Sequence, residues 1–169
     1  MFMPMRLFFI LFSIIKIAAL ANATEKPNFV WIISEDNSIH YLDHFFPGGA
    51  DTPNIKKMAQ HGITFDNAFS NAPVCSVARS TLITGCYAPR IGAQYHRKTL
   101  MVPMPERVRM FPSYLRDKGY YTTNRSKTDY NVVPGKGVWH ESSGKAHWRK
   151  RKEGQPFLDF QKVLLDYFN

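Results

Sequence analysis

Residues 28–37 of the chain read NFVWIISEDN. The first seven form a short, nearly continuous apolar run, rich in β-branched and aromatic side chains, which is typical of a buried strand in a parallel sheet. The run ends in Glu35, Asp36 and Asn37, so two acids follow directly where the strand passes into a loop. Open α/β sheets bind their ligands at the carboxyl ends of their strands. This stretch therefore predicts an α/β fold with two carboxylates at a ligand-binding edge.

Helix and strand patterns alternate along the rest of the chain. Thr52 followed by Pro53 predicts a helix start, because threonine is a good N-cap and proline fits the first helical position. Gly85 and Gly119 predict helix ends. Strands that alternate with helices indicate a mostly parallel sheet flanked by helices. The expected helices are 53–61, 75–84 and 111–118, the expected strands are 28–34, 63–69, 120–123 and 157–160, a loop is expected at 132–154, and a helical turn is expected at 163–169.

The N-terminal residues have a different character from the rest. Arg6 precedes the apolar run 7–15, and Ala21-Asn22-Ala23 follows, which is the order of a signal peptide with its cleavage site. A lysine interrupts the apolar stretch, which is also short for a membrane-spanning helix. We therefore expect a signal peptide at 1–23, a mature domain at 24–169 and export to the periplasm or the extracellular space. No stable membrane insertion is expected after cleavage, and an uncleaved membrane anchor is the alternative.

The chain is basic, with a net charge of +9 at pH 7. A basic exported protein favours anionic partners such as sulfated glycans, anionic lipid or nucleic acid, and charge alone does not choose among them. The densest basic run, residues 149–152, is most simply interpreted as a solvated loop. The composition, with 44% hydrophobic and 14% aromatic residues, is that of a globular domain and not of a disordered chain.

The stretch from Cys75 to Gly85 carries the candidate chemistry. Cys75 opens an expected helix, where the helix dipole and the free backbone amides favour an anion. Arg79 lies one turn further, so its guanidinium can reach the same anion. Taken alone, the pattern fits an anion site, a reactive thiol or a buried structural cysteine. A disulfide between Cys75 and Cys86 is compatible with export, but it would remove Cys75 as a nucleophile.

Taken in order, these motifs resemble the sulfatase family, part of the alkaline-phosphatase-like superfamily. The resemblance covers residues 26–127, most of the expected mature chain. Each match is short, but so many in the right order make the resemblance specific. The matching residues are Lys26-Pro27-Asn28, Glu35-Asp36, Thr52-Pro53-Asn54-Ile55, Phe65-Asp66-Asn67-Ala68-Phe69, Ala72-Pro73-Val74-Cys75, Arg79, Leu82-Ile83-Thr84-Gly85, Pro112-Ser113-Tyr114-Leu115, Gly119-Tyr120 and Lys127.

The resemblance implies a chemistry and assigns residues to it. In the family, a formylglycine-generating enzyme oxidises the motif cysteine to formylglycine, and a hydroxyl of the aldehyde hydrate attacks the sulfur of a sulfate ester. Cys75 falls on that cysteine, and Arg79 falls on the arginine that holds the hydrate. Glu35 and Asp36 fall on paired carboxylates that bind a calcium ion, with Cys75 as their neighbour at the metal. Lys127 falls on a lysine that contacts the sulfate.

Several positions need separate interpretation. His96 follows the motif helix and fits either the substrate pocket or an ordinary surface or core position. Val77 stands where the family usually has proline or alanine, which bears on whether Cys75 is converted. Glu35 replaces a more usual aspartate, so its carboxylate lies one methylene further from the backbone. Asp129 replaces a common histidine, and a carboxylate there repels sulfate unless it faces a partner.

The end of the chain departs from the family pattern more strongly. Residues 155–158 resemble the start of the next core strand, whereas residues 159–162 no longer follow the family. In sulfatases, later strands supply a second pair of metal ligands. They also supply a histidine and another lysine to the active site. We therefore expect an incomplete alkaline-phosphatase-like fold, through truncation or a frameshift, with exposed strand edges and apolar surface. The chain alone is expected to be poorly soluble and inactive.

Three function classes compete. The first is a sulfuric ester hydrolase that acts on sulfated glycans. The second is a phosphoester or phosphonoester hydrolase of the same superfamily, which would use the same nucleophile. The third is a non-catalytic secreted binder of anionic glycans that uses the basic surface. Nucleic-acid binding explains the charge but neither the signal peptide nor the motif, so no nucleic-acid partner is expected.

Overall fold

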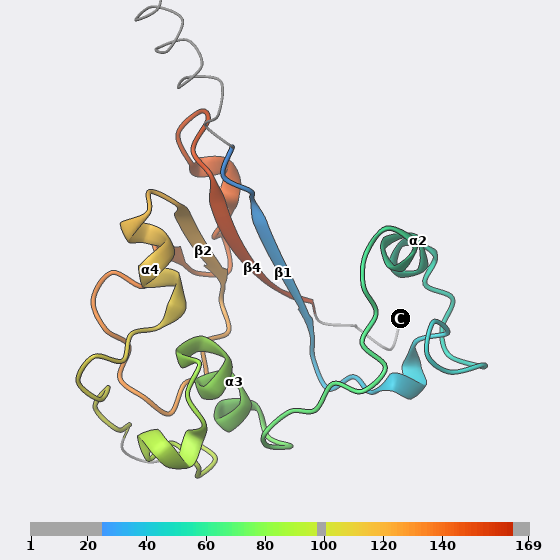
Figure 1. Cartoon of the computed structure of the whole chain (residues 1–169), viewed down its shortest axis with the longest axis horizontal. Coiled ribbons are helices and arrows are strands. Elements are labelled where there is room, and N and C mark those ends of the chain that lie inside the picture. The colour runs from blue at the N-terminus through green and yellow to red at the C-terminus, as the bar shows by residue number, and fades with distance from the viewer. Residues whose placement is uncertain (1–24, 98–100, 164–169) are drawn as a thin grey trace, which may run out of the picture.

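The computed structural model describes residues 25–97 and 101–163. Its centre is a four-stranded parallel sheet with the strand order β1-β4-β2-β3, so the expected α/β fold is confirmed (Figure 1). β4 pairs with β1 on one side and with β2 on the other, which brings the two ends of the described chain together. The strands are β1 (Phe29–Ser34), β2 (Tyr121–Arg125), β3 (Glu141–Ser142) and β4 (Phe157–Val163).

The three expected helices all form. They are α2 (Pro53–His61), α3 (Cys75–Thr84) and α4 (Phe111–Asp117), and short 3-10 turns occur at η1 (Ile39–Tyr41), η2 (Ala88–Ile91) and η3 (Trp148–Lys150). α4 packs on the sheet, because the Phe111 ring lies 5.6 Å from the Trp31 ring, which itself lies 4.8 Å from that of Phe160. α2 lies away from α4, on the other side of β1 in Figure 1, and has no buried residue.

Helix α3 is fixed in place by its apolar residues and by its end. Gly85 closes it with φ 67°, a left-handed conformation that glycine adopts without the steric cost of a side chain. Val77 and Ile83 of α3 are buried, with 3% and 1% of their surface exposed. They belong to the main apolar cluster, which also contains Ala88, Ile91, Ala93, Met110, Tyr130, Val132 and Val138. The position of Cys75 at the start of this helix therefore depends on the core.

A matched pair of substitutions on α3 tests this dependence. Ile83→Ala should lower the free energy of unfolding by about 2–5 kcal/mol, because it leaves a cavity in the core. Leu82→Ala, one residue away but with 46% of its surface exposed, should cost less than about 1 kcal/mol. Urea unfolding of both variants measures the difference. An equal loss of unfolding free energy in the two variants would mean that packing of the Ile83 face does not stabilise α3.

Two strand predictions need correction. β1 was expected to be buried, but it is an edge strand in the described sheet, with Val30 56% and Ile32 59% exposed. The expected strand 63–69 does not form, and Ile63, Phe65 and Phe69 are strongly exposed. Apolar side chains there suggest a strand, but among the described residues this segment pairs with no strand of the sheet. The exposed apolar edge that the sequence predicts is present at β1.

The remaining expectations fall into two groups. Segment 132–154 is mainly loop as expected, although it contains β3 and η3. The predicted signal peptide lies outside the described residues, as does the predicted C-terminal helical turn apart from Val163, which ends β4. Among the residues that the structure describes, no helix is both long enough and apolar enough to cross a bilayer.

Candidate active site

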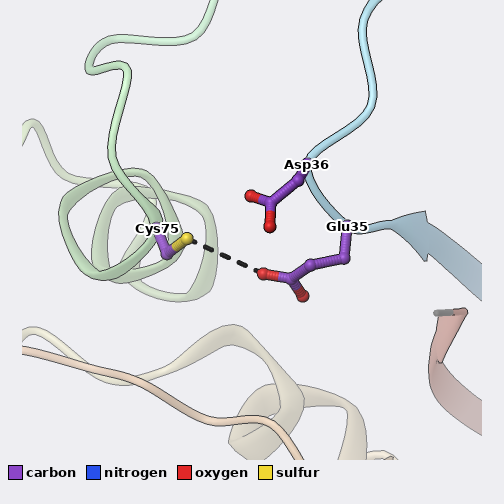
Figure 2. Close-up of side chains that lie close together, drawn as sticks. All are labelled: Glu35, Asp36 and Cys75. Carbon is purple, nitrogen blue, oxygen red and sulfur yellow. Dashed lines mark hydrogen bonds between the residues drawn. The ribbon is translucent and has the colours of Figure 1, made fainter. Parts of the chain in front are cut away.

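The end of β1 meets the start of α3. Glu35 and Asp36 follow β1 directly, and Cys75 is the first residue of α3. The Cys75 thiol donates a hydrogen bond to Glu35 Oε1, with sulfur and oxygen 3.7 Å apart, although the residues are separated by 40 positions in the chain. Figure 2 shows the thiol and both carboxylates directed into the same space between the strand end and the helix start. The sheet edge expected from residues 28–37 therefore carries these three groups.

These three residues are also the candidate metal ligands. One ligand atom from each of Glu35, Asp36 and Cys75 lies within 4.8 Å of the other two, and no other such group occurs among residues 25–97 and 101–163. Calcium takes six to eight hard oxygen ligands, and two carboxylates supply part of such a shell. The donor set therefore fits a calcium ion at Glu35 and Asp36, with further oxygen ligands needed to complete the coordination. A thiol is a soft ligand, so Cys75 would suit this ion better after conversion to an oxygen-bearing side chain.

Two lysines hold the Glu35 carboxylate. Lys127, after β2, forms an ion pair with Glu35 Oε1, and Lys162, near the end of β4, lies 3.2 Å from Oε2. Burial acts to raise the pKa of Glu35, but hydrogen bonds from both lysines outweigh it, so the pKa is lowered. Burial also acts to lower the pKa of Lys127, and the hydrogen bond to Glu35 outweighs that effect and raises it. The two ammonium groups therefore lie next to the carboxylate that would hold a cation.

Arg79 holds the loop that carries Lys127. Arg79 is a buried residue, and its Nε and Nη2 donate hydrogen bonds to the carbonyl oxygens of Thr128 and Lys127 at 2.9 and 2.6 Å. The resemblance implies that Arg79 holds the reacting group, and this stays a prediction. In the structure its guanidinium bonds to the backbone of this loop, so Arg79 connects the motif helix to the lysine loop.

Ser76 connects the motif helix to a second loop. Its hydroxyl lies 2.9 Å from His96 Nδ1, and it accepts a hydrogen bond from the Arg97 backbone amide at 3.1 Å. The Arg97 guanidinium forms a two-point ion pair with Asp129, with both nitrogen–oxygen distances 3.3 Å. The negative charge of Asp129 is therefore paired with a cation, which reduces the repulsion that this carboxylate would exert on a sulfate. His96 lies beside the residue that follows the motif cysteine.

The backbone is strained around this cluster. Of five non-glycine residues with positive φ in the described chain, four are in the loops that surround Cys75: Asp36, Arg97, Ser126 and Asp129. Such conformations cost about 1–3 kcal/mol each and persist where the surrounding contacts fix them, which is common at functional sites. The clustering supports the interpretation of this region as the active site.

Comparison with known proteins identifies the family. The profile described as Sulfatase matches residues 27–169. The chain belongs to the sulfatase family. It is 38% identical over 145 residues to an ulvan-active sulfatase of Formosa agariphila, covering 79% of this chain and 24% of that protein. It is 28% identical over 109 residues to human N-acetylgalactosamine-6-sulfatase, covering 59% of this chain and 21% of the human protein.

Solved structures agree on the fold. One solved structure is that of a protein in complex with its substrate, D-glucosamine-2-N,6-O-disulfate. It superposes on this chain with a TM-score of 0.66 at 17% identity, and the match covers 85% of this chain and 35% of the other. The phosphonate monoester hydrolase of Agrobacterium radiobacter gives a TM-score of 0.51 at 25% identity, covering 82% and 26%. The alkaline-phosphatase-like fold is therefore confirmed. This sulfatase-family chain spans about a quarter of the length of the curated relatives named above.

Two basic residues near the motif of this sulfatase-family chain, Lys162 and Arg97, were not predicted as site residues from the sequence. Lys162 reaches Glu35 because β4 lies beside β1, and the register pairs Lys162 with Ile33. A lysine near the carboxyl end of an expected parallel strand was a usable signal, but the strand was expected to end at residue 160. Arg97 had no signal in the sequence, since its pairing depends on Asp129.

Both cysteines are free, so the structure contains no Cys75–Cys86 disulfide.

The lysine contacts of Glu35 predict a pH dependence of stability in the metal-free protein. The carboxylate has a pKa below its ordinary 4.5 when folded, so the unfolded chain takes up a proton first as the pH falls. The stabilisation is present above pH 4.5 and is lost as the pH falls through the lowered value. With chelator present, Glu35→Gln should therefore lower the melting temperature at pH 7, and the difference from the parent should shrink as the pH is lowered below 4.5. A difference that stayed the same throughout this acid titration would contradict the assignment.

Proposed function

We propose that this chain forms the nucleophile-bearing part of the active site of an exported sulfatase that hydrolyses sulfate esters of glycans. The observation that carries the proposal is the meeting of the Cys75 thiol with Glu35 and Asp36 at one sheet edge, inside a sulfatase-family sequence. Glu35 and Asp36 follow β1, whereas Cys75 begins α3, so the fold brings together groups that lie about forty positions apart in the chain.

The charged side chains have distinct roles in this proposal. A sulfate ester carries negative charge, which grows on the leaving oxygen as the ester bond breaks, so the site must supply fixed positive charge. Lys127 and Lys162 converge on Glu35 and are positioned to bind sulfate oxygens once they leave that carboxylate. Arg79 fixes the backbone of the Lys127 loop through its two carbonyl contacts. It is therefore a positioning residue for Lys127.

The proposed cofactors match the donor groups of the chain. Glu35 and Asp36 would hold calcium, and Cys75 would be the residue that a formylglycine-generating enzyme converts. When bound, calcium supplies positive charge at the sulfate, and formylglycine supplies a hydroxyl nucleophile that is regenerated in each cycle. The surroundings of Cys75 serve this role, because the thiol position lies at a helix start and next to the carboxylate that would face the metal.

The substrate class is proposed from the relatives and from charge. The ulvan-active and N-acetylgalactosamine-6-sulfatase relatives act, by their names, on a polysaccharide and on a sulfated amino sugar. The net charge of +9 suits a polyanionic substrate. Export to the periplasm or the extracellular space, where polysaccharides occur, agrees with the expected signal peptide. Because the chain spans about a quarter of these relatives, we expect it to release little sulfate by itself.

A chimera tests the proposed reaction without relying on the length of this chain. In the chimera, residues 27–162 replace the corresponding segment of the ulvan-active sulfatase. Expressed with a formylglycine-generating enzyme, it should hydrolyse an aryl sulfate, and chelation of calcium should abolish the activity. Aryl phosphate and aryl phosphonate are assayed alongside, because the Agrobacterium neighbour is a phosphonate monoester hydrolase. Preference for either phosphorus ester by more than about tenfold in kcat/KM would replace the sulfatase proposal with the phosphoester or phosphonoester class.

A further inference from the structure

A basic surface lies at the end of the sheet opposite the active site. Three separate segments build it, each just before the amino end of a strand. Lys26 precedes β1, Lys118 precedes β2, and the run 149–152 precedes β4. Figure 1 shows η3 near the start of β4. Glu35 directly follows Ser34, the last residue of β1, and so lies at the opposite end of the parallel sheet. We call the five residues Lys26, Lys118, Arg149, Arg151 and Lys152 the basic end surface.

Hydrogen bonds hold the three segments together. Lys26 Nζ donates to the carbonyl oxygen of Lys118 at 2.6 Å, which joins the first two segments. Gln155 Nε2 donates to the carbonyl oxygen of Gly119 at 3.0 Å, and Gln155 Oε1 accepts from the Lys152 amide at 3.2 Å. The charges are therefore neighbours through the fold and not only through the sequence. Independent solvated loops would not be expected to form such hydrogen bonds with one another.

An aromatic stack orders the arginines. The Trp148 and Phe157 rings are stacked, with centroids 4.9 Å apart and an 11° angle between their planes. The Arg149 and Arg151 guanidinium carbons lie 4.7 and 4.8 Å from the centroid of the Trp148 ring. These cation–π contacts restrict the arginine side chains before any ligand arrives, which lowers the entropic cost of binding. Trp148 is only partly exposed, because Phe157 and the two arginines lie against its ring, so less of the ring is accessible to a base or a bilayer.

Neighbouring acids offset only part of this charge. Lys150 is paired with Glu141 at 2.7 Å, and Asp117 is paired with Arg109 at 2.6 Å, so these two acids are directed to cations outside the basic end surface. Glu25 and Glu153 are the other acids in the segments that build the surface. Arg149, Lys152 and Lys118 are exposed. The surface therefore keeps a net positive charge that is accessible to solvent.

We propose that the basic end surface is a second, non-catalytic binding site for a sulfated polysaccharide, separate from the active site. The choice of polysaccharide rests on the proposed function. Guanidinium forks bind sulfate groups through paired hydrogen bonds, and the partly occupied Trp148 ring makes binding by stacking or insertion less favourable. The seven residues of β4 separate this surface from the active-site edge by roughly 20 Å. A long polymer bound here stays attached to the protein while another part of it enters the active site.

Heparin binding by the full 169-residue chain tests the proposal without any turnover. The test variant combines Lys118→Ser, Arg149→Ser and Lys152→Ser. The control variant combines Lys57→Ser, Arg90→Ser and Lys136→Ser, which removes the same number of exposed positive charges elsewhere. We expect heparin affinity about tenfold or more weaker in the test variant, and the slope of log affinity against log salt smaller by about two to three. The control variant should retain wild-type affinity within about twofold.

The remaining arms separate this site from the active site and from other partners. Heparin binding should persist in Cys75→Ala and in chelator, whether or not the protein proves to be a sulfatase. Equal weakening in the two triple variants would overturn the proposal, because it would mean that only net charge matters. Loss of binding in Cys75→Ala or in chelator would place the heparin at the active site. Tighter binding to vesicles that contain phosphatidylserine than to heparin, at equal salt, would identify the surface as a membrane contact.

Discussion

Cys75→Ala should lower aryl sulfate hydrolysis by the chimera by about four orders of magnitude or more, since removal of a covalent nucleophile removes the main reaction path. The other free cysteine provides the control. Cys86 is partly buried against the core, away from the Glu35 and Asp36 cluster. Cys86→Ala should keep kcat within about threefold of the parent, because it alters packing only slightly.

The two cysteine variants also separate loss of chemistry from loss of folding. Both should give the same melting temperature within a few degrees, measured by circular dichroism. If Cys75→Ala retained more than about one per cent of the parental kcat/KM, Cys75 would not be the nucleophile. If both variants were inactive, the assignment of a purely structural role to Cys86 would be wrong.

Arg79→Met should destabilise the chain by about 2–4 kcal/mol, because it leaves the carbonyl oxygens of Lys127 and Thr128 without their buried donors. Arg79→Lys should recover only part of this loss, since an ammonium group lacks the planar fork that meets both carbonyls. Urea unfolding measures the free energies. Arg90→Met is the matched control, because Arg90 is exposed and should cost less than about 0.5 kcal/mol.

The same variant should release the Lys127 loop. Trypsin cleaves after lysine, so cleavage after Lys127 should become faster in Arg79→Met under native conditions, while cleavage after the exposed Lys57 should not change. An Arg79→Met chain as stable as the parent within about 1 kcal/mol would contradict the role of Arg79 as the link between motif helix and loop.

Local patterns in the sequence were enough to predict most elements that build the site. The apolar run before Glu35 and the helix between Cys75 and Gly85 each contain their own start and end signals, and both form as expected. The segment 63–69 has an apolar pattern as well, but a strand also needs a partner, and its sequence contains no information about one. The prediction that β1 is buried was wrong for the same reason, because the position of a strand within a sheet depends on its neighbouring strands.

Residues whose roles depend on distant contacts were beyond prediction from sequence patterns. Lys162 reaches Glu35 only because β4 lies beside β1, and Arg97 gains its place through Asp129. The basic end surface combines segments separated by about ninety and thirty residues, joined by contacts such as Lys26 to Lys118. The run 149–152 alone therefore looked like a solvated loop.

The proposed active site depends on the conversion of Cys75 to formylglycine, which mass spectrometry can detect. The chimera is expressed with a formylglycine-generating enzyme, purified by its aryl sulfate activity and digested, and the peptide that contains Cys75 is analysed by mass spectrometry. This peptide should have the mass of the aldehyde form, and the converted fraction should rise and fall with specific activity across preparations. Full sulfatase activity in a preparation whose Cys75 peptide is entirely the unmodified thiol would contradict it.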